Sequence, residues 1–433
     1  MQLTENIANS DIEQVKHSLV RYAEKFNLAL ILDSNSHIFP NGPHLNKKFD
    51  LIAGFANEVD NMHKITCFEE LYKIDHELKQ WYLGFITYDL KNKLETLHSN
   101  NPDQLKWPLL FFFKPTILIH LSGSKLEIHS EREDLQPHTL LKELTASQID
   151  LRTSENFQLI PRFSKEEYLT RTNGIMSHIH RGDVYELNFC QEFYDHVEIN
   201  PYNAFLSMNY QTPSPFAAFL KVNKRFLISA SPERFLKKEK DWIISQPMKG
   251  TSPRSANTDK DQVFRQTLNK SQKERAENIM ITDLVRNDLA KIAIKNSVRV
   301  DELCGIYGFP HVFQMISTIR ARIKPVSFAD ILKATFPMGS MTGAPKIKAM
   351  ELIEKFETVK RGLYSGAVGY IAPGMDFDFN VVIRSMQYNA QTNYLSYMTG
   401  SAITALSDTQ KEYEECLLKS YAINPSQTVS FYA

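Results

Sequence analysis

Short runs of apolar residues, separated by turns rich in Asn, Pro and Gly, characterise the first third of the chain. Runs of this kind are typical of strands. They predict strands at residues 28–32, 49–53, 82–88 and 109–113. Residues 130–163 are polar and aperiodic apart from a short helical pattern, LLKEL. We therefore expect a boundary near residue 155, between a β-rich N-terminal subdomain at 1–155 and a second unit at 156–433.

Beyond this boundary, helices and strands alternate irregularly. Ser164 begins a helix with a capping-box signature, because its hydroxyl can accept from a first-turn amide while Glu167 reciprocates three residues later. A longer helix is expected at about 271–290, and Pro373 and Gly374 form a hairpin-like turn. Such mixing predicts a large α+β fold rather than a doubly wound parallel sheet.

Composition narrows the class of protein. The chain has 433 residues, of which 42% are hydrophobic and 11% aromatic, enough to bury a core. A disordered or fibrous protein is thereby excluded. Lysine and arginine together number 50, and so do aspartate and glutamate. Because no net charge favours nucleic acid or an anionic membrane as a partner, any anion must be recognised locally.

The most apolar stretch, residues 107–121, is interrupted by prolines, a lysine and a histidine, so it predicts two core strands rather than a membrane span. The N-terminus shows neither the basic flank nor the apolar run of a secretion signal, and we expect a cytoplasmic protein. The cysteines lie far apart without a CxxC pair, which predicts reduced thiols rather than disulfides or a zinc site. They are Cys67, Cys190, Cys304 and Cys416.

Two pairs of glutamates share a spacing that suits a hard cation. Glu274 and Glu277 lie three residues apart in the long predicted helix, so both face one side of it. Glu412 and Glu415 repeat this spacing on another predicted helix near the C-terminus. Mg²⁺ prefers oxygen ligands and needs only one or two direct carboxylates beside an anionic substrate. Two solvated helix faces are the alternative.

Two glycine-rich turns could contribute an anion site: MTGAPK at 341–346 and MTGSA at 398–402. In the first, Thr342 can cap a helix whose first turn contains Pro345, which leaves backbone amides free for a carboxylate. Lys346 could add positive charge. An ordinary capped helix explains Thr342 and Pro345 equally well.

Lys249 lies in QPMKGT, between a predicted strand and a glycine. A lysine that points into a desolvated cleft beside other cations has a lowered pKa, and it can then act as a neutral amine nucleophile. A surface lysine is the alternative for this position.

Seven motifs together resemble the chorismate-binding enzyme family, in the family's order, over roughly residues 163–422. They are SASPERFL, QPMKGT, ERAENIMITDLVRNDLA, GSMTGAPKIKAMELIE, YSGAVGYI, VVIRSM and TGSAI with the ExxE pair that follows it. Within the family, the similarity is closest to the aminodeoxychorismate synthase component I branch. The resemblance implies antiparallel sheets flanked by helices, as in anthranilate synthase component I, and makes 156–433 the chorismate-binding catalytic domain.

The resemblance also implies a chorismate site beside Mg²⁺. Glu277 and Glu415 would bind the metal directly, and Glu274 and Glu412 would bind it through water. Glu233, in SPER, would handle protons at the departing hydroxyl. The residues expected to contact chorismate are Thr251, Gln314, Thr342, Lys346, Tyr370, Arg384, Gly400 and Ser401.

Position 249 distinguishes the branches, since anthranilate synthases carry alanine in this P-x-x-G-T context and aminodeoxychorismate synthases carry lysine. The similarity implies that the Lys249 amine attacks C2 of chorismate as the C4 hydroxyl leaves. Ammonia then enters at C4 and expels the lysine. The product would be 4-amino-4-deoxychorismate, a precursor of para-aminobenzoate and folate. Anthranilate synthase component I, in which ammonia enters at C2, and a non-catalytic chorismate-binding subunit are the alternatives.

Two residues depart from the family pattern. Glu186, in GDVYELN, stands where this branch usually has glutamine and where isochorismate synthases use a lysine to activate water, so water addition is not expected. Gln314 replaces a histidine; it can donate a hydrogen bond but brings no positive charge. None of the cysteine contexts resembles the nucleophile elbow of a glutamine amidotransferase. The resemblance therefore implies a separate amidotransferase subunit that supplies ammonia.

Overall fold

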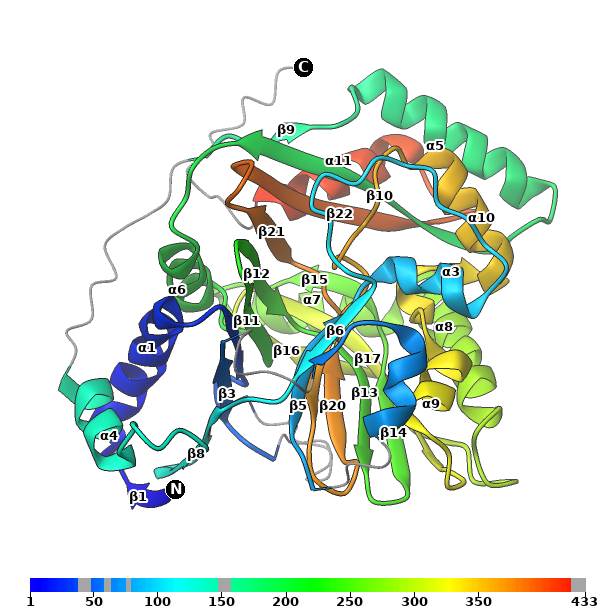
Figure 1. Ribbon diagram of the computed structural model, residues 1–433. Coiled ribbons are helices and arrows are strands. Elements are labelled where there is room, and N and C mark those ends of the chain that lie inside the picture. Colours follow the sequence, from blue (N-terminus) through cyan, green and yellow to red (C-terminus); the bar gives the residue numbers. More distant parts are fainter. Residues whose placement is uncertain (38–47, 58–63, 75–78, 147–156, 422–433) are drawn as a thin grey trace.

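Two antiparallel sheets packed face to face form the centre of the molecule, and helices cover their outer surfaces (Figure 1). The computed structural model describes residues 1–37, 48–57, 64–74, 79–146 and 157–421. Every strand pairing among these residues is antiparallel. The predicted α+β fold, with antiparallel sheets flanked by helices, is confirmed.

The larger sheet has 12 strands, and β9 (Ile160–Pro161) pairs with β10 at its side. The other strands follow the order β1 (Gln2–Asn6), β8 (Lys125–Ser130), β7 (Ile117–Ser122), β3 (Leu51–Ala56), β2 (Leu28–Asp33), β11 (Phe216–Val222), β12 (Arg225–Ser231), β21 (Ser385–Asn389), β22 (Tyr394–Thr404), β10 (Glu186–His196) and β18 (Gly343–Ala344).

The second sheet has 10 strands, and β16 (Arg299–Gly308) pairs with β17 beside the main path. The order along this path is β15 (Met248–Pro253), β17 (Val312–Arg322), β14 (Trp242–Gln246), β13 (Arg234–Glu239), β20 (Phe377–Asn380), β19 (Ala367–Ile371), β5 (Tyr82–Ile86), β6 (Leu110–Phe113) and β4 (Lys64–Ile65).

Strand alternation divides the core into three layers. In β2, Leu28 and Leu30 point between the sheets while Ala29 and Ile31 point to the helices, as the two-residue period of a strand requires. Six helices pack on the larger sheet: α1 (Ile12–Tyr22), α4 (Pro137–Ala146), α5 (Lys165–His180), α6 (Pro201–Gln211), α10 (Lys346–Phe356) and α11 (Thr409–Tyr421). On the second sheet lie α2 (Leu71–Ile74), α8 (Gln272–Ala290) and α9 (Phe328–Thr335).

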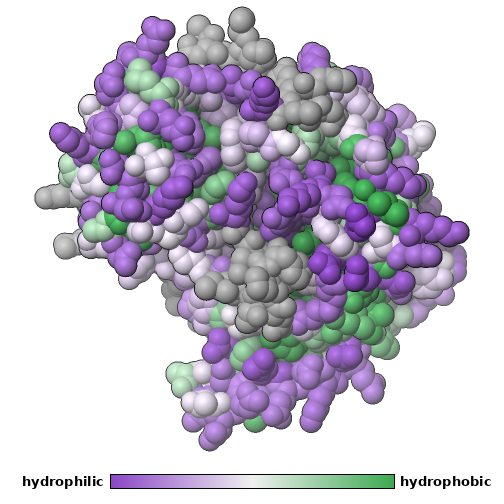
Figure 2. Space-filling view, turned by 90° about the horizontal axis from the view of Figure 1, so that it is seen from below, coloured by the Kyte–Doolittle hydropathy of each residue, from purple (hydrophilic) through white to green (hydrophobic). Residues whose placement is uncertain are grey.

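Two further helices are peripheral to these layers. The short α3 (Lys91–Leu94) follows β5, and α7 (Thr258–Lys270) packs on β15 and β16. The surface seen from below is largely hydrophilic, with hydrophobic side chains in scattered patches (Figure 2). Within the part of the chain that the structure describes, no helix is both long and apolar enough to cross a membrane.

The local predictions agree with the structure to within a few residues. Residues 28–32 and 109–113 form β2 and β6. The strand predicted at 49–53 begins two residues later and continues to Ala56, and the one predicted at 82–88 ends at Ile86. The stretch at 107–121 forms two buried strands, β6 and β7, as predicted.

Both predicted helix starts are confirmed by their capping hydrogen bonds. Ser164 Oγ accepts from the Glu167 amide at 3.2 Å, and Glu167 Oε2 accepts from the Ser164 amide at 2.9 Å, which completes the capping box. Ser271 Oγ accepts from the Glu274 amide at 3.3 Å and so begins α8. The first carboxylate pair therefore lies in the opening turns of a helix.

The predicted boundary near residue 155 falls within residues 147–156, which lie outside the described residues, and the division into 1–155 and 156–433 stays a prediction. Strands from both sides of it lie side by side in each sheet, since β2 pairs with β11 and β5 pairs with β19. Both parts of the chain thus contribute to one core between the sheets.

A buried ion pair ties α10 to the larger sheet. Arg361 is 1% exposed, and its Nε donates to Glu357 Oε2 at 2.9 Å. Its guanidinium also donates to the carbonyl oxygens of Asn188 and Met341, at 2.9 and 2.7 Å. Glu357 Oε1 accepts from the Cys190 amide at 3.0 Å. Removing one partner would leave a buried charge uncompensated.

We therefore expect Glu357→Ala to lower the free energy of unfolding by about 3–5 kcal/mol, measured by urea denaturation. Glu351→Ala is the matched control, because Glu351 pairs with Lys348 on the exposed side of the same helix. Its effect should stay below about 1 kcal/mol. Equal stabilities for the two variants would contradict this role of the buried pair.

Candidate active site

Lys249 lies on β15, close to the start of α8. Gly250 has φ +98°, and a Cβ there would come within 3.2 Å of Glu274 side-chain atoms, so glycine lets the strand approach the helix. Asn278 Nδ2 donates to the Lys249 carbonyl at 3.3 Å and fixes the backbone. The Lys249 side chain is only 11% exposed. It is a largely buried lysine and not a surface one.

The nearest partner of Lys249 is Glu186, the first residue of β10 in the other sheet. Lys249 Nζ lies 2.9 Å from Glu186 Oε1, and Glu186 is completely buried. Burial lowers the pKa of Lys249, but the carboxylates of Glu186, Glu277 and Glu233 outweigh it, so that the pKa is raised. In this structure the charged neighbours of Lys249 are carboxylates rather than cations, and the lowering of its pKa beside a bound cation stays a prediction.

Glu233 lies in the turn between β12 and β13 and is 3% exposed. Its Oε1 accepts a hydrogen bond from Ser340 Oγ at 2.7 Å. Burial raises the pKa of Glu233 to about 7, against the opposing effects of Ser340 and Lys249. A carboxyl group with this pKa can hold a proton at neutral pH and give it up during a reaction.

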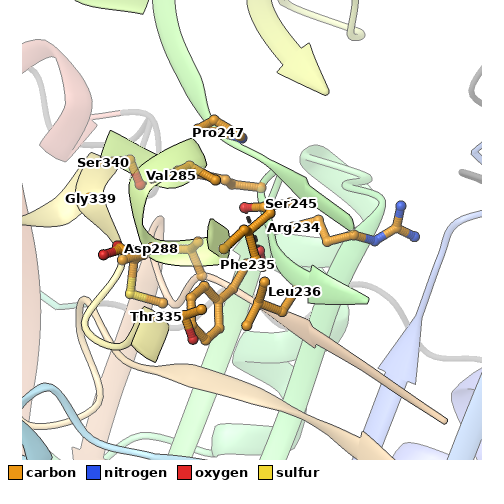
Figure 3. A pocket seen from close by; sticks show the side chains of 14 residues that line it. Arg234, Phe235, Leu236, Ser245, Pro247, Val285, Asp288, Thr335, Gly339 and Ser340 are labelled. Carbon is orange, nitrogen blue, oxygen red and sulfur yellow. Dashed lines mark hydrogen bonds between the residues drawn. The ribbon is translucent and has the colours of Figure 1, made fainter. Parts of the chain in front are cut away.

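A small cavity of about 20 Å³ lies beside Glu233. Ser340 and Gly339 form one side of it, Val285 and Asp288 of α8 contribute another, and Arg234 points away from it (Figure 3). Nε and Nη2 of Arg234 donate instead to Asp378, at 3.0 Å each, and Nη1 donates to Gln246 at 2.6 Å. The walls around Glu233 are thus mostly apolar, which explains the raised pKa.

The four glutamates predicted to hold a metal gather around one lysine. Lys273 Nζ lies 3.5 Å from Glu412 Oε1 and 3.9 Å from Glu277 Oε1. Burial lowers the pKa of Lys273, yet Glu412, Glu277, Glu274 and Glu415 together raise it. The two helices therefore bring both ExxE pairs to one place, and they are not independent solvated faces.

These carboxylates do not surround a ready-made cage. Among the described residues, three ligand atoms within 4.8 Å of one another occur only at His120, Glu127 and His129, on the β7–β8 hairpin. Glu415 is paired with Lys419 at 2.7 Å and is about half exposed. Positive charge between Glu277 and Glu412 is supplied by Lys273, which a bound cation would have to displace.

Several buried polar atoms have no hydrogen-bond partner within the described part of the chain. They include Glu277 Oε1 and the hydroxyls of Thr399 and Ser401. Burial raises the pKa of Glu277 to about 7, an effect that Glu186 and Glu274 increase and Lys249 opposes. An orphaned carboxylate oxygen suits a hard cation. The glutamates present therefore fit Mg²⁺.

Three of the predicted substrate residues form a chain of hydrogen bonds. Gln314 shares a hydrogen bond of 3.0 Å with Thr251 Oγ1, and its amide oxygen is placed to accept from Arg384 Nη2 at 2.9 Å. Burial lowers the pKa of Arg384, and no carboxylate of the described residues forms an ion pair with it. A guanidinium without a counter-ion is suited to an anionic ligand.

Gly400 and Ser401 lie on β22, opposite Cys190 and Phe189 of β10. A Cβ at Gly400 would lie 2.4 Å from the Phe189 carbonyl oxygen, so only glycine allows the strands to pair here. The Gly400 carbonyl accepts from Lys419 Nζ at 2.9 Å. This glycine keeps β22 paired with β10, the strand on which Glu186 lies.

The structure does not bring Tyr370 together with these residues. Its ring lies between the sheets, 5.8 Å from that of Trp81 and 6.1 Å from that of Phe49. Tyr364 lies closer to Gly400, because its hydroxyl is 3.7 Å from the Sγ of Cys190, the β10 residue that pairs with Gly400. The motif YSGAVGYI contains both tyrosines, and the sequence alone had pointed to the second.

Thr342 does not cap a helix, contrary to the prediction. Gly343 and Ala344 form β18 on the edge of β10, and α10 starts only at Lys346, with Pro345 at its cap position. The Thr342 hydroxyl bonds instead to the carbonyl oxygens of Met338 and Gly339. Inserting two strand residues between threonine and helix removes the capping geometry.

Lys346 bonds to two of the residues that line the cavity beside Glu233, Asp288 and Thr335. Its ammonium pairs with Asp288 and donates to the Thr335 carbonyl at 3.3 Å. Burial lowers the pKa of Lys346, while Asp288 opposes the shift. The charge of Lys346 is thus used to neutralise a buried aspartate.

Comparison with known proteins agrees with this arrangement. The chorismate binding enzyme family matches residues 30–425. Aminodeoxychorismate synthase component 1 of Klebsiella aerogenes is 32% identical over 77% of this chain and 74% of its own length. The chloroplastic aminodeoxychorismate synthase of Arabidopsis thaliana is 37% identical over 84% of this chain but only 38% of its own length.

Among solved structures, anthranilate synthase component I from Streptococcus pneumoniae matches 82% of this chain and 85% of that one, with a TM-score of 0.71 and 24% identity. The fold is therefore shared with that enzyme. A family match over most of the sequence and a relative above 30% identity agree with the grouping of motif residues described above. The chain belongs to the chorismate binding enzyme family.

Proposed function

We propose that this chain is the chorismate-aminating component of an aminodeoxychorismate synthase, which converts chorismate and ammonia to 4-amino-4-deoxychorismate. The observation that carries the proposal is the buried Lys249, whose Nζ lies 2.9 Å from Glu186 and in the field of Glu233. Relatives named for this activity, with about 32% identity, support it.

Substrate binding is supported by the polar groups that lack partners. Arg384, fixed by Gln314, offers a positive charge for a carboxylate. Gly400 and Ser401 would approach the same anion through their backbone amides. Thr251, bonded to Gln314, would then lie along the ring. The loss of the family histidine at 314 is offset because glutamine still orients the arginine.

The chemistry would proceed by two displacements. The neutral Lys249 amine forms a bond to C2, the ring double bonds shift, and the C4 hydroxyl leaves as water with a proton from Glu233. Ammonia then attacks C4, the double bonds shift back, and the electron pair of the C2–N bond returns to Lys249. Nitrogen is thereby delivered to C4, whereas direct attack at C2 would give the anthranilate pathway.

Mg²⁺ would be held by Glu277 and Glu415 directly and by Glu274 and Glu412 through water. The orphaned Glu277 oxygen supports this assignment. When bound, a hard cation offsets the negative charge of a substrate carboxylate among these glutamates. Lys273 would have to move away from Glu277 and Glu412, its present partners at 3.9 and 3.5 Å.

The rival activity is that of anthranilate synthase component I, whose fold is the same. Lys249 argues against it, since that branch carries alanine in this context. A binding subunit without turnover is the second rival, and the raised pKa of Glu233 argues against it. Incubation with chorismate, Mg²⁺ and ammonium, followed by chromatography against both authentic products, tests the proposal. Anthranilate, or unchanged chorismate, would refute it.

Ammonia would come from a separate glutamine amidotransferase subunit. A glutaminase needs an accessible thiolate. Burial raises the pKa of Cys190 to about 12 and that of Cys416 to about 11, and Cys304 is also buried. The remaining cysteine, Cys67, is exposed, but its pKa is raised as well.

We expect the purified chain to form product with ammonium and less than about 1% of that rate with glutamine, because it has no activated thiol. Chromatographic product assays at equal nitrogen concentrations check this. Treatment with a glutamine-site alkylating inhibitor should leave ammonium-dependent turnover unchanged. Product formed from glutamine at a rate comparable to that with ammonium would contradict the prediction.

A further inference from the structure

Glu186 is an unusual carboxylate for its surroundings. It is 0% exposed, and apart from the ion pair with Lys249 neither of its oxygens has a hydrogen-bond partner within the described ranges. Buried carboxylates are normally bound by several donors, because burial without them is costly. A carboxylate with one ammonium as its only partner has free lone pairs that face that nitrogen.

The fold holds this pair rigidly from two sides. Glu186 pairs with Thr404 of β22 on one side and with Ala344 of β18 on the other. The neighbouring Gly343 allows this, since a Cβ there would lie 2.1 Å from the Glu186 carbonyl oxygen. Lys249 comes from the second sheet. The ion pair therefore joins the two sheets at the candidate active site.

The ion pair also creates a chemical requirement. An ammonium has no electron pair, so Lys249 must lose a proton before it bonds to carbon. Besides Glu186, four carboxylates act on Lys249: Glu233, Glu277, Glu274 and Glu415. Glu233 is needed with its proton for the departing hydroxyl, and the other three are assigned to the cation. Among the described residues, only Glu186 is both paired with Nζ and without another assigned role.

We propose that Glu186 is the positioning residue of Lys249: it seats the amine against the substrate and receives the proton that the amine gives up. This inference rests on the proposed function. In the first displacement, one proton moves from the Lys249 ammonium to a Glu186 oxygen, the nitrogen pair forms the bond to C2, and the C4–O bond breaks to release water with the Glu233 proton.

The second displacement restores the pair. When ammonia bonds to C4, the C2–N bond breaks and its electrons return to Lys249, which leaves as a neutral amine. Glu186 then returns its proton to Lys249, and Glu233 regains one from solvent. No oxidant or further reactant is required. Glutamine at this position could seat the lysine but could not take its proton, which gives Glu186 a role that a glutamine lacks.

The test is the rate of adduct formation at Lys249, measured by rapid quenching and mass spectrometry with chorismate and Mg²⁺ but without ammonium. Glu186→Gln is expected to bind chorismate within threefold of the wild-type affinity and to form the adduct about 100-fold more slowly. Its rate should rise with pH, because hydroxide then removes the proton. Glu186→Asp keeps a carboxylate and should stay within about tenfold.

Glu192→Gln is the matched control, because Glu192 is a buried glutamate on the same strand that pairs with Arg162 instead. Its adduct rate should not change. An adduct formed by Glu186→Gln at the wild-type rate at every pH overturns the inference and leaves the proposed function intact. If the wild type makes 4-amino-4-deoxychorismate without any adduct, the lysine step fails, and the role of Glu186 fails with it.

Discussion

Lys249→Arg should form no covalent adduct with chorismate and should lose at least about 1,000-fold in ammonium-dependent turnover. Arginine keeps a positive charge beside Glu186, but its guanidinium stays protonated at the pH of the assay and cannot act as a nucleophile. The wild type, incubated with chorismate and Mg²⁺ alone, should gain the mass of chorismate minus water at Lys249. Adding ammonium should discharge this adduct.

The control for this experiment is Lys237→Arg, another buried lysine, which pairs with Glu239 on β13 outside the site. Its turnover should stay within about twofold, as expected for a conservative change away from the chemistry. Lys249→Ala is a softer test, since it recreates the anthranilate-type motif and could leave some direct amination. Wild-type turnover in Lys249→Arg would show that the lysine acts only through its charge.

Glu277→Gln should lower Mg²⁺-dependent turnover at limiting Mg²⁺ by at least about 100-fold. Glu277 interacts electrostatically with both Lys249 and Lys273. One of its oxygens has no hydrogen-bond partner among the described residues. Glutamine keeps the shape of the side chain but removes the hard anionic ligand. Glu415→Gln should behave in the same way, although 138 residues separate the two (415 − 277).

Glu414→Gln is the matched control. Glu414 lies on α11 next to Glu415, but it accepts a hydrogen bond from Gln410 at the exposed surface. Its Mg²⁺ dependence should be that of the wild type. Thermal unfolding with and without Mg²⁺ provides a second readout, since the cation should stabilise the wild type and not Glu277→Gln. Wild-type activity in Glu277→Gln at limiting Mg²⁺ would exclude Glu277 as a ligand.

The fold of Glu277→Gln should be intact. Because folding raises the pKa of Glu277 to about 7, the folded protein holds this proton more tightly than the unfolded chain does. This group therefore makes the free energy of unfolding fall as pH rises from about 4.5 to about 7. Glutamine removes that penalty, so the variant should be no less stable than the wild type at pH 8.

Local chemistry could be predicted from the sequence because it depends on nearby residues. The capping box at Ser164 and the helix start at Ser271 each depend on two residues three positions apart, and both were confirmed. The ExxE spacing likewise placed each glutamate pair on one helix face. Pairings between distant strands, such as β2 with β11, are set by the whole core and have no local signal.

The errors at the candidate site have the same cause. Glu186 and Lys249 are 63 residues apart (249 − 186) and come from different sheets, so no pattern in the sequence predicts their ion pair. No local pattern therefore indicated that carboxylates surround Lys249 and raise its pKa in this structure. Tyr370 was assigned by the family resemblance, and the packing that places its ring beside Trp81 and Phe49 between the sheets has no local signal. The prediction that Thr342 caps a helix was wrong because β18 lies between Thr342 and the start of α10.

The position of nitrogen in the product tests the central claim most directly. The purified chain, chorismate, Mg²⁺ and ¹⁵N-ammonium should give a product whose ¹⁵N couples to C4 of the ring in NMR, with the enolpyruvyl group retained. That result requires delivery of ammonia to C4 and identifies 4-amino-4-deoxychorismate. A ¹⁵N signal coupled to C2, with loss of pyruvate to give anthranilate, would contradict the account.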